Sequence, residues 1–136
     1  MKRRQALKIS SIATIGLTAT VHGGCSKNNI LFNHGVASGD PLAERVILWT
    51  RVTPSKPGPV KVNLEISSDQ NFTSIAFAKV LSTSSLVDYT IKYDFFVKNI
   101  FKSGETFFYR FNASGSVSET GKTKTLAADV NKIKMG

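Results

Sequence analysis

Alternation of apolar and polar residues is the feature of this sequence that most restricts its fold. The run Val60–Ser67 alternates without interruption, and Tyr89–Phe95 and Phe107–Asn112 repeat the pattern. Successive side chains of a β-strand point to opposite faces of a sheet, so this period of two predicts strands with one buried and one solvated face. No segment after residue 29 has the spacing of an amphipathic helix.

Other segments add strands to these three. The run Arg45–Arg51 is apolar and continuous between two charged residues, which predicts a strand that is buried on both faces. Weaker candidates are Leu31–Gly35, Ser74–Leu81 and Gly121–Thr125. Residues typical of turns separate these runs at Ser38–Pro41, Pro54–Pro59, Ser67–Asp69, Lys102–Gly104 and Ser114–Ser116.

About seven short strands within residues 30–128 predict an all-β domain. The expected architecture is an antiparallel β-sandwich of the immunoglobulin or fibronectin type III kind. Nine phenylalanines, three tyrosines and one tryptophan supply large buried areas, so the domain can fold without a disulfide. The expected core residues are Trp49, Val62, Leu64, Tyr89, Ile91, Tyr93, Phe107 and Phe111.

The net charge of +9 does not by itself indicate a nucleic-acid partner. The sequence has 18 basic and 9 acidic residues, and four of the basic ones lie within the first eight positions. The others are scattered along the chain, whereas a nucleic-acid interface gathers basic residues on one face with aromatic residues among them. We therefore expect no nucleic-acid binding.

Residues 1–29 have the composition of an export signal. A basic stretch precedes the 13-residue apolar run Ile9–Val21, which suits a signal core and is short for a transmembrane segment. The basic stretch resembles the twin-arginine export motif through Arg3, Arg4, Leu7 and Lys8. An ordinary secretory signal that contains two arginines is the alternative. The twin-arginine export machinery carries folded proteins across the membrane, so we expect a periplasmic or secreted protein.

The single cysteine of the sequence lies near the end of this leader. Cys25 follows two glycines and precedes Ser26, which resembles the cleavage site of bacterial lipoproteins, in which the cysteine becomes the lipidated first residue. His22 departs from that pattern, because an aliphatic residue is usual three positions before the cysteine. Lipidation of Cys25, and with it a lipid anchor, is one reading; a small residue in a cleaved leader is the other.

Five blocks of the sequence resemble the PhoD-type alkaline phosphatase and phosphodiesterase family. The first two, FNHGVASGDP and RVILWTRV, are the most specific. The similarity covers nearly all of residues 32–128, and the blocks keep the family's order and spacing. They are Phe32–Pro41, Arg45–Val52, Asp88–Lys92, Phe107–Phe111 and Gly121–Leu126.

The resemblance implies that this region and the catalytic activity belong to two separate domains. In that family this region is an N-terminal fibronectin type III-like domain, and an exported metallophosphoesterase domain follows it. The family's metal ions, calcium and iron by resemblance, are held by that second domain, so we expect no cofactor and no catalytic residue in this chain. Residues 129–136 would begin the linker to the missing or separately encoded catalytic domain.

Two groups of residues remain as candidates for contact. Val36, Ser38, Asp40 and Pro41 are expected at the surface, either as a simple tight turn or as a contact with the catalytic domain. His34 is read as a hydrogen-bonded structural histidine in preference to a metal ligand. A different class of function stays open as well, namely a free-standing exported sandwich that binds a protein or glycan partner.

Replacing Arg3 and Arg4 with lysine tests the export signal. Because the export receptor reads the arginine pair, the double variant should leave the precursor in the cytoplasm. Cell fractionation followed by immunoblotting measures this distribution. Unchanged export of the double variant would show that the leader uses another route.

Overall fold

The computed structural model describes residue 24 and residues 26–128. The predicted export motif, the predicted lipidation site at Cys25 and the predicted linker at 129–136 lie outside the described residues. Within the described part, no helix is long and apolar enough to cross a membrane.

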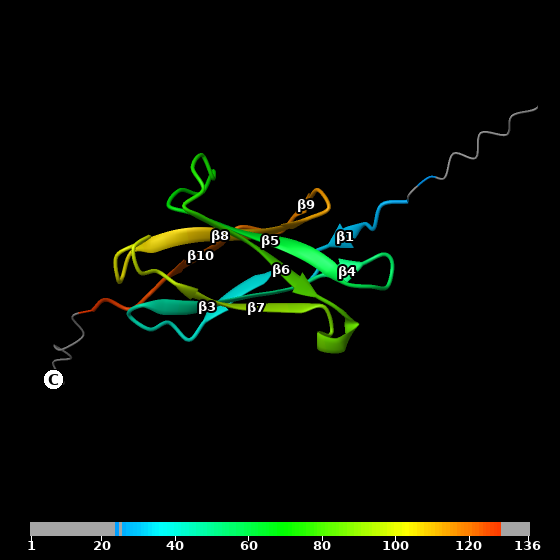
Figure 1. Ribbon diagram of the computed structural model, residues 1–136. Coiled ribbons are helices and arrows are strands. Elements are labelled where there is room, and N and C mark those ends of the chain that lie inside the picture. Colours follow the sequence, from blue (N-terminus) through cyan, green and yellow to red (C-terminus); the bar gives the residue numbers. More distant parts are fainter. Residues whose placement is uncertain (1–23, 25, 129–136) are drawn as a thin grey trace, which may run out of the picture.

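Ten strands and one short 3₁₀ helix make up the described part (Figure 1). Seven of the strands have four or more residues, in agreement with the number expected from the sequence. The elements are β1 (Ile30–Leu31), β2 (Val36–Gly39), β3 (Arg45–Arg51), β4 (Thr53–Pro54), β5 (Val60–Ser67), β6 (Phe77–Thr83), η1 (Ser85–Val87), β7 (Thr90–Phe96), β8 (Thr106–Ala113), β9 (Ser116–Val117) and β10 (Gly121–Lys124).

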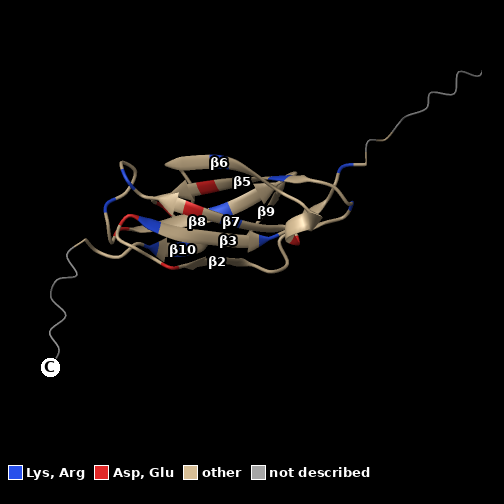
Figure 2. Cartoon of the chain, turned by 60° about the horizontal axis from the view of Figure 1, so that its bottom comes forward, with Lys and Arg blue, Asp and Glu red and all other residues tan. Residues whose placement is uncertain are grey.

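The strands form two main layers, and all neighbouring strands that pair are antiparallel. One layer has the order β10-β8-β5-β6, with β9 paired to β8, and the other has the order β2-β3-β7. The short strands β1 and β4 pair with each other. In Figure 2 the domain is turned so that the β2-β3-β7 sheet comes toward the viewer. The predicted all-β antiparallel architecture is therefore confirmed.

Alternating residues of both sheets meet in one core. Val62 and Leu64 of β5 and Phe107 and Phe111 of β8 are buried, opposite Ile91 of β7, as the sequence predicts. Burial of each large side chain contributes roughly 1.5–3 kcal/mol. The two sheets meet where the Phe95 ring lies 5.4 Å from that of Phe107, which in turn stacks on Phe101 at 4.9 Å.

The prediction that Trp49 belongs to the core is wrong. Strand β3 alternates, with Val46, Leu48 and Thr50 buried and Trp49 half-buried on the outer face. The described residues place no layer over that face, so an apolar run here does not mean burial on both sides. Tyr89 and Tyr93 are also only partly buried, although they pack against the core.

The segment after His34 also differs from the prediction. Leu31–Gly35 was expected to be a strand, but β1 ends at Leu31 and a turn follows, in which the Gly35 amide donates to the Phe32 carbonyl. The strand begins at Val36 and includes Ser38 and Gly39, which were expected in a turn. Small residues have low β-propensity, so the alternation does not reveal β2; its pairing with β3 does.

Strand β6 protects its sheet edge with a charged residue. The predicted strand Ser74–Leu81 is shifted, and the observed one, Phe77–Thr83, pairs only with β5. Lys79 lies on the core side of this edge, with its ammonium 5.6 Å from the centre of the Tyr93 ring. An inward-pointing lysine discourages pairing with strands from other molecules.

Gly121 provides a test of the packing between β10 and β8. A Cβ atom at Gly121 would lie 2.2 Å from the ring of Tyr109, its partner in the register. Gly121→Ala should therefore lower the free energy of unfolding by about 1–3 kcal/mol, as overpacking does in well-packed cores. Urea denaturation measures this change.

Gly39→Ala is the matched control, since a Cβ atom at this strand position meets nothing within 4 Å. The control should leave the unfolding midpoint close to that of the wild type. Equal stability of the two variants would contradict the observed approach of Tyr109 to Gly121.

Candidate functional site

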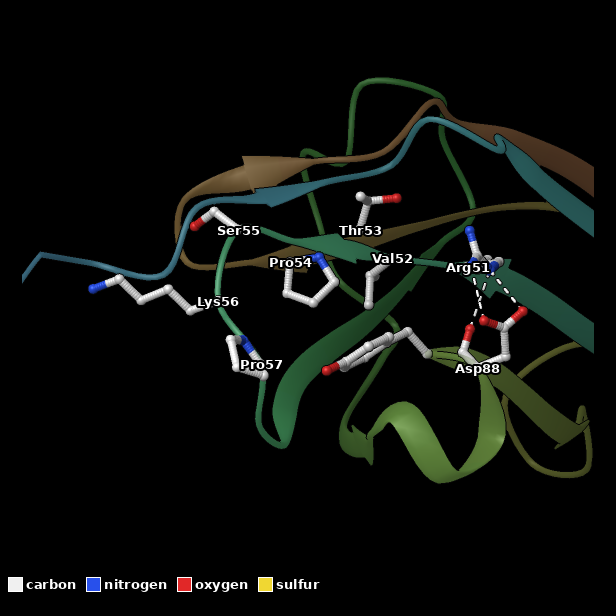
Figure 3. Close-up of a pocket in the computed structure, with 9 residues that line it drawn as sticks. Arg51, Val52, Thr53, Pro54, Ser55, Lys56, Pro57 and Asp88 are labelled. Atoms are coloured by element: carbon white, nitrogen blue, oxygen red, sulfur yellow. Dashed lines mark hydrogen bonds and ion pairs between the residues drawn. The ribbon is translucent and has the colours of Figure 1, made fainter.

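A charged cluster lies where β3 ends. Arg51 is the last residue of β3, Asp88 follows η1, and His34 lies in the turn between β1 and β2. The cluster thus joins three of the sequence blocks that resemble the phosphatase family. Figure 3 shows Arg51 and Asp88 facing each other at the edge of a shallow groove.

The Arg51 guanidinium uses most of its donors within this cluster. Its Nε donates to Asp88 Oδ2 at 3.1 Å and its Nη2 to Asp88 Oδ1 at 2.8 Å, so the carboxylate is held in a bidentate pair. Nε also donates to the Asp88 backbone carbonyl at 3.1 Å. Nη1 lies 2.6 Å from Nε2 of His34. This imidazole is therefore hydrogen-bonded, as the structural interpretation of His34 expects.

The ion pair shifts the pKa of both partners. Hydrogen bonds from Arg51, followed by its positive charge, lower the pKa of the Asp88 carboxyl, and the nearby His34 adds a smaller effect in the same direction. The same hydrogen bonds raise the pKa of Arg51. Asp88 is exposed and Arg51 is partly exposed, so solvent screens their attraction.

The backbone at this cluster is strained. Asp88 and Tyr89 both have a φ angle of 54°, in the left-handed region that bulky side chains rarely adopt. The two amides donate to the carbonyls of Ser85 and Ser84, and the Tyr89 carbonyl accepts from the amide of Val52. Because Arg51 also binds the Asp88 carbonyl, it fixes this strained turn to the end of β3. We call Arg51, Asp88 and His34 the clasp.

The groove beside the clasp has a volume of about 410 Å³. The Tyr89 hydroxyl accepts a hydrogen bond from the Gly58 amide at 3.3 Å, and Asn28 binds the Lys56 amide at 3.1 Å, so the loop between β4 and β5 is held from both sides. The groove is lined by Arg51, Val52, Thr53, Pro54, Ser55, Lys56, Pro57, Asp88 and Tyr89 (Figure 3).

The clasp does not have the arrangement of a catalytic or metal site. The His34 imidazole faces a guanidinium, whereas a nucleophile relay needs it to face a hydroxyl and a carboxylate. The described residues contain no group of three or more histidine, cysteine, aspartate or glutamate side chains that could hold a metal. Calcium requires six to eight oxygen ligands, which the Arg51, Asp88 and His34 side chains do not supply.

The residues predicted to contact another domain lie along and just beyond β2. Val36 and Ser38 pair with Thr50 and Leu48, so their side chains point toward the core side of the sheet, although β2 is an edge strand and Ser38 is exposed. Asp40 and Pro41 follow the strand and are exposed. Their contact with another domain stays a prediction.

The sequence reasoning missed the pairing of Arg51 with Asp88, although both residues lie in blocks that it singled out. The two are 37 positions apart, and no local pattern links them. A weak signal was present, since each charged residue flanks a predicted strand.

Comparison with known proteins relates this chain to the N-terminal domain of one phosphatase family. Residues 18–127 match the family described as PhoD-like phosphatase, N-terminal domain. Alkaline phosphatase D of Bacillus subtilis (strain 168) is 32% identical in an alignment of 105 residues, and this alignment covers 71% of this chain and 17% of that protein. The chain therefore spans less than a fifth of the length of this curated relative.

Two solved structures resemble the fold. A structure of PhoD superposes with a TM-score of 0.64 and 31% identity, over 71% of this chain and 19% of that one. The sensor domain of the anti-sigma factor RsgI4 of Pseudobacteroides cellulosolvens superposes with a TM-score of 0.51 over 76% of this chain and 98% of its own. At 15% identity, the second likeness concerns the fold alone.

The clasp predicts an acid-sensitive contribution to stability. Because the folded-state pKa of Asp88 is lowered, the pair stabilises the fold fully above the unfolded pKa of about 3.9, and this stabilisation disappears as the pH falls through the folded pKa. Asp88→Asn should lower the melting temperature at pH 7, and the difference from wild type should shrink toward pH 2. Thermal melts across this range measure it.

Asp40→Asn is the control, because Asp40 also has a positive φ angle but forms no ion pair with a described residue. A constant difference between Asp88→Asn and wild type from pH 7 to pH 2 would contradict the assigned role of the carboxylate.

Proposed function

Since the chain belongs to the family of PhoD-like phosphatase N-terminal domains, we propose that it serves as the non-catalytic docking domain of an exported, metal-dependent phosphoric ester hydrolase. The observation that carries this proposal is the extent of the match. The family match at residues 18–127 includes nearly the whole described sandwich, yet the alignment with the relative named as a phosphatase accounts for only 17% of that relative.

The chemistry of the described residues supports a non-catalytic role. Metal-assisted phosphate ester hydrolysis needs converging ligands that hold the metal and lower the pKa of a bound water. The clasp instead pairs a histidine with an arginine, whose positive charge opposes cation binding. In this proposal the calcium and iron ions, and the hydrolysis itself, belong to the metallophosphoesterase domain.

Export is the second part of the proposal. The arginine pair and the apolar run of the leader support transport in a folded state, which suits an enzyme that acquires metal ions before it crosses the membrane. The mature protein then acts in the periplasm or outside the cell. Lipidation of Cys25 would keep it at the membrane surface.

Docking is supported by apolar side chains that the sandwich leaves exposed. Phe96 is 56% exposed, and Leu42 and Leu126 are also exposed near the same end of the domain. Exposed apolar groups that lie close together often mark surfaces that a partner covers.

Two assays test the proposal. The purified 136-residue chain should release no phosphate from mono- or diesters in the presence of calcium, iron, zinc or manganese. When it is co-expressed with the phosphatase portion of the Bacillus subtilis relative, it should co-purify with that portion and raise its melting temperature.

The RsgI4 sensor domain is a suitable control, because it shares the fold at only 15% identity and should not co-purify. Metal-dependent turnover by the chain alone, lost in His34→Ala, would overturn the non-catalytic role. Failure of the chain to bind the phosphatase portion, together with binding to a glycan, would favour the free-standing module instead.

A further inference from the structure

The two outer faces of the sandwich differ in chemistry. The outer face of the β10-β8-β5-β6 sheet carries mainly charged and amide side chains, with Ala78, Val80 and Phe108 among them, and Glu65 forms an ion pair with Arg110 across it. Other polar residues on this face are Lys61, Asn63, Asn112 and Lys122. The charged residues on this face favour contact with water.

The outer face of the β2-β3-β7 sheet is richer in apolar side chains. Trp49 pairs with Ala37 on one side and Lys92 on the other, and Ile47 pairs with Gly39. Phe96 lies beside Arg45 at the end of this face. We call the outward-facing set the tryptophan face; it consists of Ala37, Gly39, Ile47, Trp49 and Phe96.

The small residues of β2 leave the tryptophan face open on one flank. A Cβ atom at Gly39 would meet nothing within 4 Å, so the space above this residue is free. Ala37, opposite Trp49, is exposed. Trp49 therefore has a flank that no larger side chain of β2 covers, and a side chain from a partner has room to pack there.

Charged groups surround these apolar residues. Arg45 forms an ion pair with Asp94, and the Arg51–Asp88 pair of the clasp lies at the opposite end. The second carboxylate oxygen of Asp94 is shielded from solvent and has no donor among the described residues. Aromatic residues enclosed by a polar rim containing arginine are typical of protein interfaces, in which tryptophan often contributes most of the binding energy.

The place where the described part of the chain ends, at residue 128, indicates which partner would cover this face. The Leu126 amide donates to the Leu42 carbonyl at 3.0 Å, and Leu42 lies between β2 and β3. The Val97 amide donates to the Glu44 carbonyl at 2.9 Å, so the end of β7 lies at the same place. Figure 2 shows that the described chain stops at this end of the sandwich. A domain connected beyond residue 128 would thus be attached at the end of the sandwich that carries Phe96 and Gly39.

We propose that the tryptophan face is the surface on which the phosphatase domain docks, with Trp49 at the centre of the contact and Phe96 nearest to the connection. The inference rests on the proposed docking function and adds the location of the interface. It also changes the predicted contact: the outward-facing Ala37 and Gly39 replace Val36 and Ser38, while Asp40 and Pro41 lie at the edge.

Titration calorimetry between the full chain and the separately purified phosphatase portion of the Bacillus subtilis relative tests this interface. Trp49→Ala and Phe96→Ser should each weaken binding and raise the Kd at least tenfold. Val80→Ser is the matched control, because Val80 is 63% exposed on the outer face of the other sheet, and it should leave the Kd unchanged. Thermal melts establish that the variants are folded, which the partial exposure of Trp49 and Phe96 favours.

The outcomes separate the two proposals. Binding by the wild type that neither variant weakens would overturn the tryptophan face and leave the docking function in place. No binding by the wild type would overturn the docking function and this inference with it. Self-association of the chain that Trp49→Ala abolishes, seen by analytical ultracentrifugation, would assign the face to a second copy and overturn the inference.

Discussion

The burial of aromatic residues between two sheets is the constraint on which the rest of this structure depends. Phe95 from one sheet meets Phe107 from the other, and each sheet can cover only one face of its neighbour. Every strand therefore needs one apolar side and one side that tolerates water. The register of β3 with β7 follows, because a shift by one residue would turn Phe95 outward and Phe96 inward.

This constraint explains what the sequence could and could not predict. The strand Val60–Ser67 was predicted with its observed bounds, because its apolar residues alternate with polar ones as one face of the strand is buried and the other is not. Trp49 was misplaced, because an apolar residue on the outer face looks the same in sequence as one in the core. Strand β2 was missed, because its small residues carry no pattern of their own and take their conformation from β3.

The clasp could not be predicted for a different reason. The partners of Arg51 come from distant parts of the chain, and only the pairing of β3 with β2 and β7 brings His34 and Asp88 to it. Two consecutive residues in the left-handed region would be costly in isolation. Hydrogen bonds to Ser84, Ser85 and Val52 and to the Arg51 guanidinium fix this conformation, so the strained backbone is held in place by the fold itself.

The two ends of the described chain leave the sandwich in opposite directions. Ile30 pairs with Pro54, just beyond the last residue of β3, whereas Leu126 is bonded to Leu42, just before the first (Figure 1). The seven residues of β3 lie between these points, and at about 3.3 Å per residue they span roughly 23 Å. The sandwich therefore separates these two points of attachment by about that length, so that anything bound next to Ile30 and anything bound next to Leu126 is held at opposite ends of the domain.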